Sequence, residues 1–430
     1  MAATVRNPTI VGALACQKNS FLKKDFRTTV VQCEPTKKKS VYELILQDTI
    51  LFPEGGGQPS DSGLIRSAGS KDEIVVSQVV RKGLNAVHLI NEHVEPGTEV
   101  CLEINWQKRM DFMQQHTGQH LVSAILDDKW KLDTLSWSMG GVPTDKKPIV
   151  EPYELFNYIE IGRKLSEEEL LKLSDACNDY ITVQDQPITV TEHGSEAIDA
   201  EKGAMRTICI GKLDANPCCG THLQNTSQIG SILFSPFQTS ARGTNSRVYF
   251  MCGSRVLKYA KFAHTMTSRS KTLLSCSEAE IPQKIELQRA MTQKVSKREQ
   301  YWMKEVANSK AASLFDAVVE KRKAWLALDE FGTLDMLSLV QKTLTSKIEE
   351  QKIEGYKFVI CGREKATNSG VVMIVSDSAD EIANVASSLG QLVEKLKGGG
   401  GKKGGKWQGK VAEYGKPEWD SLVQFLGDNF

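Results

Sequence analysis

Hydrophobic and polar residues alternate in short runs over the first hundred residues of the chain. Runs such as TTVVQC, EIVVSQVV and AVHLI have the β-branched composition typical of strands, and turn residues separate them. Several short strands at this spacing predict a small barrel. We therefore assign residues 1–104 to a Gly-rich β-barrel domain.

The hydrophobic period becomes helical at Trp106. Apolar residues from Met110 to Ile125 recur at the intervals of one helix face. A second helix is expected after Ser166, because Glu169 three residues later completes a capping box. Strand-like runs such as RTICIG and RVYFMCG follow. We therefore predict one α+β domain over residues 105–252.

The last part of the chain begins with a stretch that has almost no glycine or proline, residues 253–322. Its segment Ile281–Glu320 is long for a globular helix and carries apolar pairs four residues apart, which predicts a protruding helix or helical hairpin. Residues 323–430 alternate strand-like and helical runs and then break into GGGGKKGGKWQGK. This pattern predicts a small α/β unit with a flexible basic loop. The fold class expected for the whole chain is α+β.

Composition sets the broad class of the protein. The chain has 430 residues, of which 40% are hydrophobic and 25% charged, as in ordinary globular proteins of more than one domain. No window approaches the roughly 20 apolar residues of a membrane span, and the first residues lack the apolar core of a signal peptide. Ten cysteines are spread without the spacing of a disulfide framework. We expect a cytoplasmic protein with no membrane partner.

Two short motifs offer metal ligands. His116 and His120 are four residues apart on the helix that begins near Trp106, so both imidazoles can face one ion. Cys218 and His222 have the same spacing in the turn sequence NPCCGTHL. Three imidazoles and a thiolate suit Zn²⁺ far better than Mg²⁺ or Ca²⁺. Thr117 occupies the position of the catalytic glutamate in zinc proteases of the H-E-x-x-H type, which argues against a peptidase.

Three motifs occur in the order found in the AlaX-type alanyl-tRNA editing proteins, and the chain resembles that family. The motifs are FPEGGGQPSDSG (52–63), HTGQH (116–120) and CCGTH (218–222). The resemblance implies a trans-editing hydrolase, a zinc-dependent aminoacyl-tRNA deacylase, whose partner is mischarged tRNA(Ala). The amino acid removed would be chiefly serine, with glycine as a second candidate. A synthetase pocket that selects alanine by size alone discriminates poorly against an amino acid that adds a hydroxyl. A second, editing site is therefore needed to remove that amino acid from the tRNA.

The resemblance also carries roles for individual residues. It implies one Zn²⁺ per chain held by His116, His120, Cys218 and His222. Residues bordering the substrate would be Glu54, Gly56, Gln58, Thr117 and Thr221, and contacts with the phosphates of the CCA end would come from Arg206 and Arg247.

Alternatives to these roles remain open. Cys219 competes with Cys218 as ligand, although only Cys218 has the four-residue offset from His222. Without the resemblance, Gln58 is more simply a solvent-facing residue in a tight turn. Four protein donors are typical of a structural zinc, so a non-catalytic RNA-binding or scaffold protein is the alternative function. No general base is evident.

The net charge of +1 conceals basic regions. Residues 253–310 hold 12 Lys and Arg against 5 Glu (+7), and residues 395–416 hold 7 Lys against Glu413 (+6), which leaves 1 − 13 = −12 for the rest. The Gly/Lys segment is expected to follow the tRNA backbone. Its candidate contacts are Lys402, Lys403, Lys406, Lys410 and Trp407, the last by stacking on a base. The long helices are interpreted as a second tRNA contact or as a homodimer interface.

Overall fold

The computed structural model describes residues 7–430 except 68–72, 144–145, 148–149, 193–197 and 200–202. The chain divides into two compact units, residues 1–270 and 271–430. Each unit mixes helices with sheets, which confirms the expected α+β class. None of the helices in this described part has the apolar run that crossing a bilayer requires.

The first unit begins with a closed barrel of six antiparallel strands in the order β1-β2-β5-β4-β3-β6. The strands are β1 (Phe26–Pro35), β2 (Tyr42–Leu46), β3 (Gly63–Ser67), β4 (Glu73–Lys82), β5 (Asn85–Ile90) and β6 (Glu99–Ile104). Alternate residues such as Val30, Leu44, Val76 and Leu102 point inward and are fully buried. The predicted small barrel is therefore confirmed. A short helix, α1 (Ala15–Lys18), precedes it.

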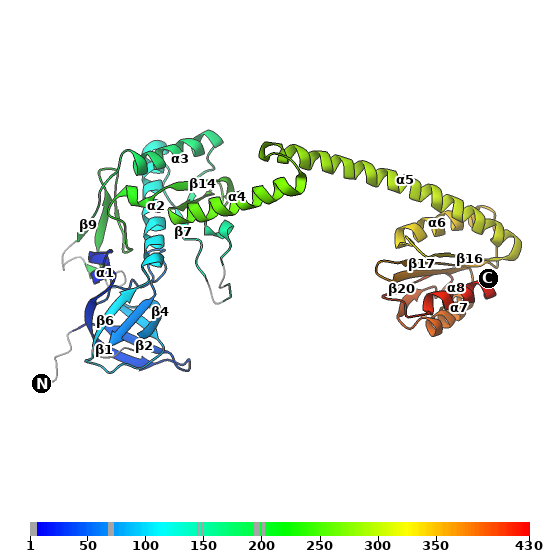
Figure 1. Cartoon of the computed structure of the whole chain (residues 1–430), viewed down its shortest axis with the longest axis horizontal. Coiled ribbons are helices and arrows are strands. Elements are labelled where there is room, and N and C mark those ends of the chain that lie inside the picture. Colours follow the sequence, from blue (N-terminus) through cyan, green and yellow to red (C-terminus); the bar gives the residue numbers. More distant parts are fainter. Residues whose placement is uncertain (1–6, 68–72, 144–145, 148–149, 193–197, 200–202) are drawn as a thin grey trace. The chain divides into compact units, whose positions relative to one another are not determined.

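The helix α2 (Trp106–Trp130) follows the barrel directly and rises away from it (Figure 1). Asn105 caps its N-terminus by accepting a hydrogen bond from the backbone N–H of Lys108 at 3.1 Å. Helix α3 (Glu167–Thr182) begins with the predicted capping box, since Ser166 and Glu169 bond to each other's backbone N–H groups. Both helices contribute to one apolar core with the sheets beside them.

Two sheets complete this part of the first unit. One has the order β14-β15-β8-β7 and the other β13-β12-β9. Their strands are β7 (Ser136–Ser138), β8 (Asn157–Ile161), β9 (Ile188–Glu192), β12 (Arg206–Ile210), β13 (Asp214–Pro217), β14 (Ile232–Ser240) and β15 (Ser246–Cys252). A short pair, β10 (Ile198–Asp199) and β11 (Gly203–Ala204), and the 3-10 turns η1 (Pro152–Leu155) and η3 (Thr226–Ile229) lie between them. Helix α4 (Ser254–Leu274) follows β15 directly.

A buried ion pair joins the barrel to α2. The Nε of Arg109 donates to both carboxylate oxygens of Asp61 at 2.9 and 3.1 Å, and both side chains are inaccessible to solvent. The guanidinium also donates to the carbonyl oxygens of Ser20 and Ile50 at 2.9 and 2.7 Å. Asp61 belongs to the Gly-rich segment and Arg109 to the helix, so this pair fixes one against the other.

The second unit contains the long helix α5 (Ile281–Lys321), whose limits agree with the predicted helical segment. A 3-10 turn, η4 (Glu278–Glu280), precedes it. Its last turns bury Ala307, Ala311, Leu314 and Val318, whereas earlier apolar side chains such as Trp302 are exposed. This exposure is what either interpretation of the helix, an RNA contact or a homodimer interface, requires.

A five-stranded sheet in the order β16-β17-β18-β20-β19 forms the rest of the second unit. Helices α5 and α6 contribute to the core on one face of the sheet, and α7 and α8 to the core on the other. The elements are β16 (Lys323–Leu328), α6 (Leu334–Glu350), β17 (Lys357–Glu364), β18 (Ser369–Ser376), α7 (Ala379–Leu392), β19 (Leu396–Gly400), β20 (Gly405–Val411) and α8 (Glu418–Asn429).

The expectation of a flexible Gly/Lys loop is wrong. Most of this segment forms the antiparallel hairpin β19–β20, and β20 also pairs with β18. The ring of Trp407 packs on Gly398 and Gly409, because a Cβ on either glycine would lie 2.4–2.5 Å from a ring carbon. These glycines make room for an aromatic side chain inside the hairpin. Trp407 is therefore half-buried in the protein, which argues against the expected stacking on a base.

Candidate metal centre

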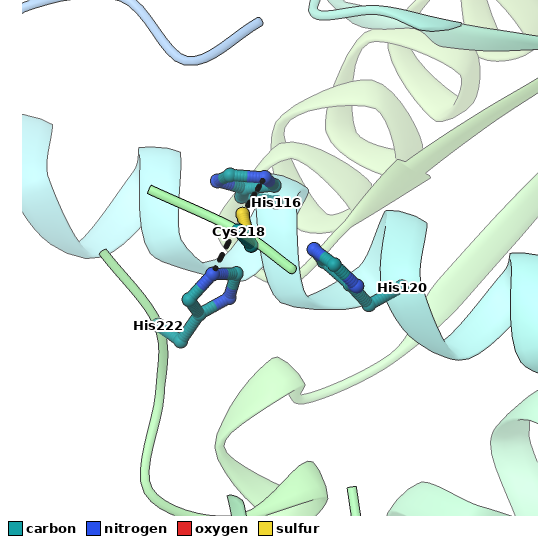
Figure 2. Close-up of side chains that lie close together, drawn as sticks. All are labelled: His116, His120, Cys218 and His222. Atoms are coloured by element: carbon teal, nitrogen blue, oxygen red, sulfur yellow. Dashed lines mark hydrogen bonds between the residues drawn. The ribbon is translucent and has the colours of Figure 1, made fainter. Parts of the chain in front are cut away.

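Four potential metal ligands meet at the middle of α2. His116 and His120 project from one face of this helix, and the turn after β13 brings Cys218 and His222 to the same point (Figure 2). One ligand atom from each residue lies within 4.8 Å of all the others. The sulfur of Cys218 is 3.4 Å from Nε2 of His116 and 3.3 Å from Nε2 of His222. The structure thus brings together the four residues that the sequence proposed as ligands.

The turn needs glycine at position 220. A Cβ there would lie 2.2 Å from Cε1 of His116, so any larger residue would displace the ring. The N–H of Gly220 also points at the sulfur of Cys218 at 3.5 Å. Cys219 lies beside this turn with its sulfur against the backbone of Gly56, outside the ligand cluster.

The surroundings of Cys218 and His222 favour the protonation states in which these two side chains bind metals. Burial by itself raises the pKa of Cys218, but the neighbouring His116 and His222 outweigh burial and hold it well below its ordinary value. Burial lowers the pKa of His222 to about 3, which keeps that imidazole neutral. A thiolate and neutral imidazoles are the forms in which these side chains coordinate an ion.

Gln58 fixes the orientation of His116. Its Oε1 accepts from the backbone N–H of Thr221 at 3.0 Å, and its Nε2 donates to Oγ1 of the same residue at 2.8 Å. Since Oε1 is an acceptor, Nδ1 of His116, 2.9 Å away, must carry the proton and donate to it. Nε2 then keeps its lone pair for a metal. Gln58 is buried behind the ligand and is not part of the pocket lining.

Replacing Gln58 by leucine is expected to weaken metal binding by about 10- to 100-fold, because His116 loses the acceptor that orients its ring. Competition with a chelating dye on the purified full chain measures this affinity. Gln78→Leu, at an exposed position of β4, is the matched control and should bind like the wild type. Equal affinities in all three proteins would contradict the role given to Gln58.

Asp214 orients the second histidine. Its carboxylate lies 3.5 Å from Nδ1 of His120, and Oδ2 has no hydrogen-bond partner among the described residues. Burial lowers the pKa of His120, but Asp214 and Cys218 more than offset this and raise it to about 9. Without an ion this ring is therefore protonated at neutral pH, and an ion that binds there must displace the proton. A carboxylate behind a ligating histidine is a common way to hold the ring in place. Sequence reasoning missed Asp214, although it stands four residues before Cys218.

Two buried side chains hold the backbone of the ligand turn. Arg206 donates through Nε to the carbonyl of Cys218 at 3.0 Å and through its terminal nitrogens to the carbonyls of Gly220 and Gln17. Nε2 of Gln17 donates to the carbonyl of Cys219 at 2.6 Å. Three successive carbonyls are therefore satisfied. This commits the guanidinium of Arg206 to the protein backbone, unlike the phosphate contact expected for it.

The other residues expected to border the substrate are distributed unevenly. Gly56 lines the pocket at the cluster, with φ +62°. Thr117 is buried, and its Oγ1 accepts from the N–H of Leu223 at 3.2 Å. The structure does not bring Glu54 or Arg247 to the pocket lining. Arg247 instead lies over the ring of Tyr158, 4.7 Å from its centre.

A pocket of about 1010 Å³ opens at the cluster. Trp137 forms one wall and stacks on His116 with ring centres 5.1 Å apart. Another wall is polar, since Gln119 donates to Ser123 at 2.9 Å and Ser123 shares a hydrogen bond with Thr134 at 2.6 Å. Sequence reasoning found neither wall, because Trp137, Ser123 and Thr134 carry no motif and meet Gln119, which lies within HTGQH, only in the folded chain.

Comparisons with known proteins show which family the chain belongs to. Residues 205–249, which include Cys218 and His222, match the family described as the threonyl and alanyl tRNA synthetase second additional domain. A Saccharomyces cerevisiae protein named for alanyl-tRNA editing, alaX, is 48% identical, with 99% of each chain covered. The chain belongs to the AlaX-type alanyl-tRNA editing proteins.

Other AlaX-type relatives cover different shares of the chain. The Mus musculus alanyl-tRNA editing protein Aarsd1 is 28% identical over 96% of this chain and 97% of its own. The Pyrococcus horikoshii alanyl-tRNA editing protein AlaX-L is 29% identical over 51% of this chain and 54% of its own. The match to the Mus musculus protein therefore extends over both units of this chain, residues 1–270 and 271–430.

Proposed function

We propose that the protein deacylates mischarged tRNA(Ala), chiefly seryl-tRNA(Ala), with glycyl-tRNA(Ala) as a second substrate. The observation that carries this proposal is the cluster of four metal ligands at the wall of a pocket, in a chain of this family. In the reaction, the oxygen of water bonds to the ester carbonyl carbon and the ester bond to the ribose oxygen breaks. That oxygen takes a proton, which releases the free amino acid and uncharged tRNA.

One Zn²⁺ per chain is the cofactor that these donors suit best. Zinc–nitrogen and zinc–sulfur bonds of about 2.0–2.3 Å place tetrahedral donors about 3.5 Å apart, close to the 3.3 and 3.4 Å between the sulfur of Cys218 and two imidazoles. When bound, zinc supplies a Lewis acid that polarises a carbonyl or a water. Gln58 and Asp214 hold the ligating rings, and Trp137 shields one side of the pocket from solvent.

The polar wall supports serine as the amino acid removed. Gln119, Ser123 and Thr134 present amide and hydroxyl groups beside His120. A site built to hydrogen-bond a hydroxyl discriminates strongly against a substrate that lacks one, as alanine does. This chemistry supports sparing of correctly charged alanyl-tRNA, and because glycine also lacks a hydroxyl, it supports serine over glycine as the preferred amino acid.

The tRNA backbone is assigned to the lysines of the β19–β20 hairpin. Lys402, Lys403, Lys406 and Lys410 are exposed, and the glycines around them allow a phosphate chain to approach closely. We also propose a cytoplasmic location, which the ten free thiols without a disulfide-framework spacing support.

Purified protein incubated with seryl-, glycyl- and alanyl-tRNA(Ala), with and without a zinc chelator, tests this function. We expect rapid loss of the seryl ester, slower loss of the glycyl ester and persistence of the alanyl ester. Chelation should stop the reaction, and added Zn²⁺ should restore it. Equal slow decay of all three esters in every sample would overturn this function and favour the non-catalytic alternative.

A further inference from the structure

Helix α4 carries positive charge without any negative charge. Its 21 residues include five Lys or Arg and no Asp or Glu. Helix α3 of the same unit has the opposite balance, with five acidic residues and Lys172 as its only basic one. Surface helices usually mix both signs, so an acid-free helix in a unit that also exposes an acidic one indicates a selective electrostatic partner.

The cations of α4 share one face. Lys258, Lys261 and Arg269 recur with Thr265 at intervals of three, four and four residues, which places them on one side of the helix. All four are exposed. Within the described parts of the chain, neither the two lysines nor Arg269 forms an ion pair, whereas Lys271 does so with Glu278 at 3.7 Å. The face thus presents three charges that no neighbouring carboxylate neutralises.

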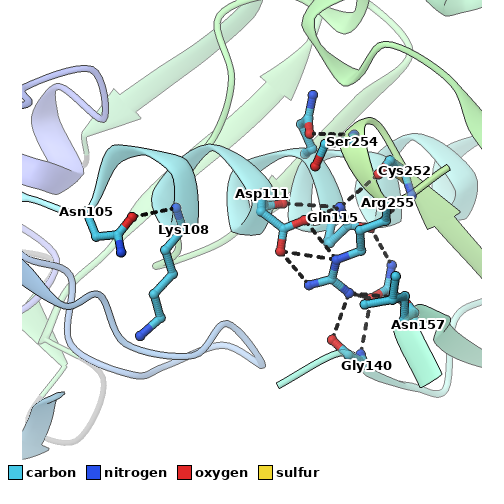
Figure 3. A network of polar contacts seen from close by, with 11 residues as sticks. Asn105, Lys108, Asp111, Gln115, Gly140, Asn157, Cys252, Ser254 and Arg255 are labelled. Atoms are coloured by element: carbon cyan, nitrogen blue, oxygen red, sulfur yellow. Dashed lines mark hydrogen bonds and ion pairs between the residues drawn. The ribbon is translucent and has the colours of Figure 1, made fainter. Parts of the chain in front are cut away.

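An ion pair with a buried arginine attaches α4 to the helix that bears His116 and His120. Arg255, in the first turn, donates to Asp111 on α2 at 2.7 and 2.8 Å and to the carbonyl of Gly140 at 2.7 Å (Figure 3). Tyr259 packs edge-on against Phe156 with ring centres 5.3 Å apart. Asp111 precedes His116 by five residues, about 7.5 Å along the helix axis. A molecule bound along α4 is therefore held at a fixed position relative to the metal centre.

We propose that this face of α4 binds the sugar–phosphate backbone of the tRNA duplex next to the aminoacylated end. Unpaired lysines and arginines bind phosphates. The hydroxyl of Thr265 donates to the carbonyl of Lys261 at 2.8 Å, and its oxygen can accept a hydrogen bond from a ribose 2′-hydroxyl. Because α4 is attached to α2, a duplex bound along α4 would have its 3′ end directed toward the pocket. This inference rests on the proposed function, which identifies the RNA as tRNA(Ala). It makes α4 a second tRNA-binding surface, besides the one proposed for the β19–β20 hairpin.

The test is a triple variant, Lys258→Ala with Lys261→Ala and Arg269→Ala, compared with a variant that loses three exposed lysines elsewhere in the same unit. Lys37→Ala with Lys38→Ala and Lys39→Ala, in the β1–β2 loop, provides this charge-matched control. Fluorescence anisotropy measures the affinity of each full chain for uncharged tRNA(Ala) over a series of salt concentrations. We expect the α4 variant to lose about 10-fold or more in affinity and the slope of log K against log salt to fall by about 3, one per cation.

Binding and deacylation are read separately, so the two proposals can fail separately. If tRNA affinity falls only in the α4 variant while no protein deacylates seryl-tRNA(Ala), the RNA surface stands and the proposed function is wrong. If the wild type is an active deacylase but the α4 variant and the control lose equal affinity, the inference is overturned. Lys258→Arg with Lys261→Arg should retain wild-type affinity and salt slope. Loss of affinity in this charge-preserving variant would also overturn it.

Discussion

Cys218→Ser is expected to lose bound zinc and to lower the rate of seryl-tRNA(Ala) deacylation by more than about 100-fold, the upper effect of removing a residue behind a ligand. The sulfur of Cys218 approaches Nε2 of both His116 and His222, and its low pKa makes it the anionic donor of the cluster. A serine hydroxyl stays protonated at neutral pH, so the variant keeps the shape of the turn and removes the charge.

The neighbouring cysteine supplies the control for this variant. Cys219 lies in the same turn, but its sulfur faces the Gly-rich segment and its pKa is raised by burial. Cys219→Ser should therefore retain zinc and most of the activity. Metal analysis and single-turnover deacylation are measured on both proteins. Loss of zinc from Cys219→Ser, with zinc retained in Cys218→Ser, would exchange the roles of the two residues.

Arg109→Met is expected to reduce the free energy of unfolding by about 3–5 kcal/mol, because it leaves Asp61 as a buried carboxylate without its partner. It also leaves the carbonyls of Ser20 and Ile50 without their donor. Urea denaturation of the full chain, followed by the fluorescence of tryptophans in the first unit, measures the change.

Two further variants separate the pair from a general effect of charge. Arg109→Met combined with Asp61→Leu should recover part of the lost stability, because it removes the buried unpaired charge. The carbonyls of Ser20 and Ile50 and the N–H of Phe52, which bonds to Asp61 at 2.7 Å, stay without partners in this variant. Arg27→Met removes an exposed ion pair with Glu99 in the same barrel and should change stability very little. If Arg109→Met were as stable as Arg27→Met, the buried pair would not be what joins the barrel to α2.

The ligand cluster could be proposed from sequence because its spacing is local. A four-residue interval on a helix and another in a tight turn each place two donors side by side, whatever the rest of the fold does. The helix α5 could be predicted for the same reason, since a long segment without glycine or proline has few alternatives.

The residues that hold the cluster could not be predicted, because their partners are far apart in the sequence. Gln17 bonds to Cys219 across 202 positions and Gln58 to Thr221 across 163. Arg206 looked like a phosphate contact because an arginine in a strand gives no sign that its donors are already used. The Gly/Lys segment misled for a different reason: composition suggested a flexible loop, whereas pairing with β18 and the packing of Trp407 order most of it.

The spacing of two pairs of contacts links the barrel to the ion thermodynamically. Gln58 and Asp61 are three residues apart in the Gly-rich segment, and their partners His116 and Arg109 are seven apart, two turns of α2. The segment therefore docks on the helix at two points, one of them a metal ligand. Coupling of this kind is reciprocal. The free energy by which the docked barrel would stabilise a bound ion equals the free energy by which that ion would stabilise the barrel against unfolding. Ion binding and barrel unfolding would then form one cooperative equilibrium. Loss of an ion from the cluster would destabilise the barrel, although the barrel contributes no ligand.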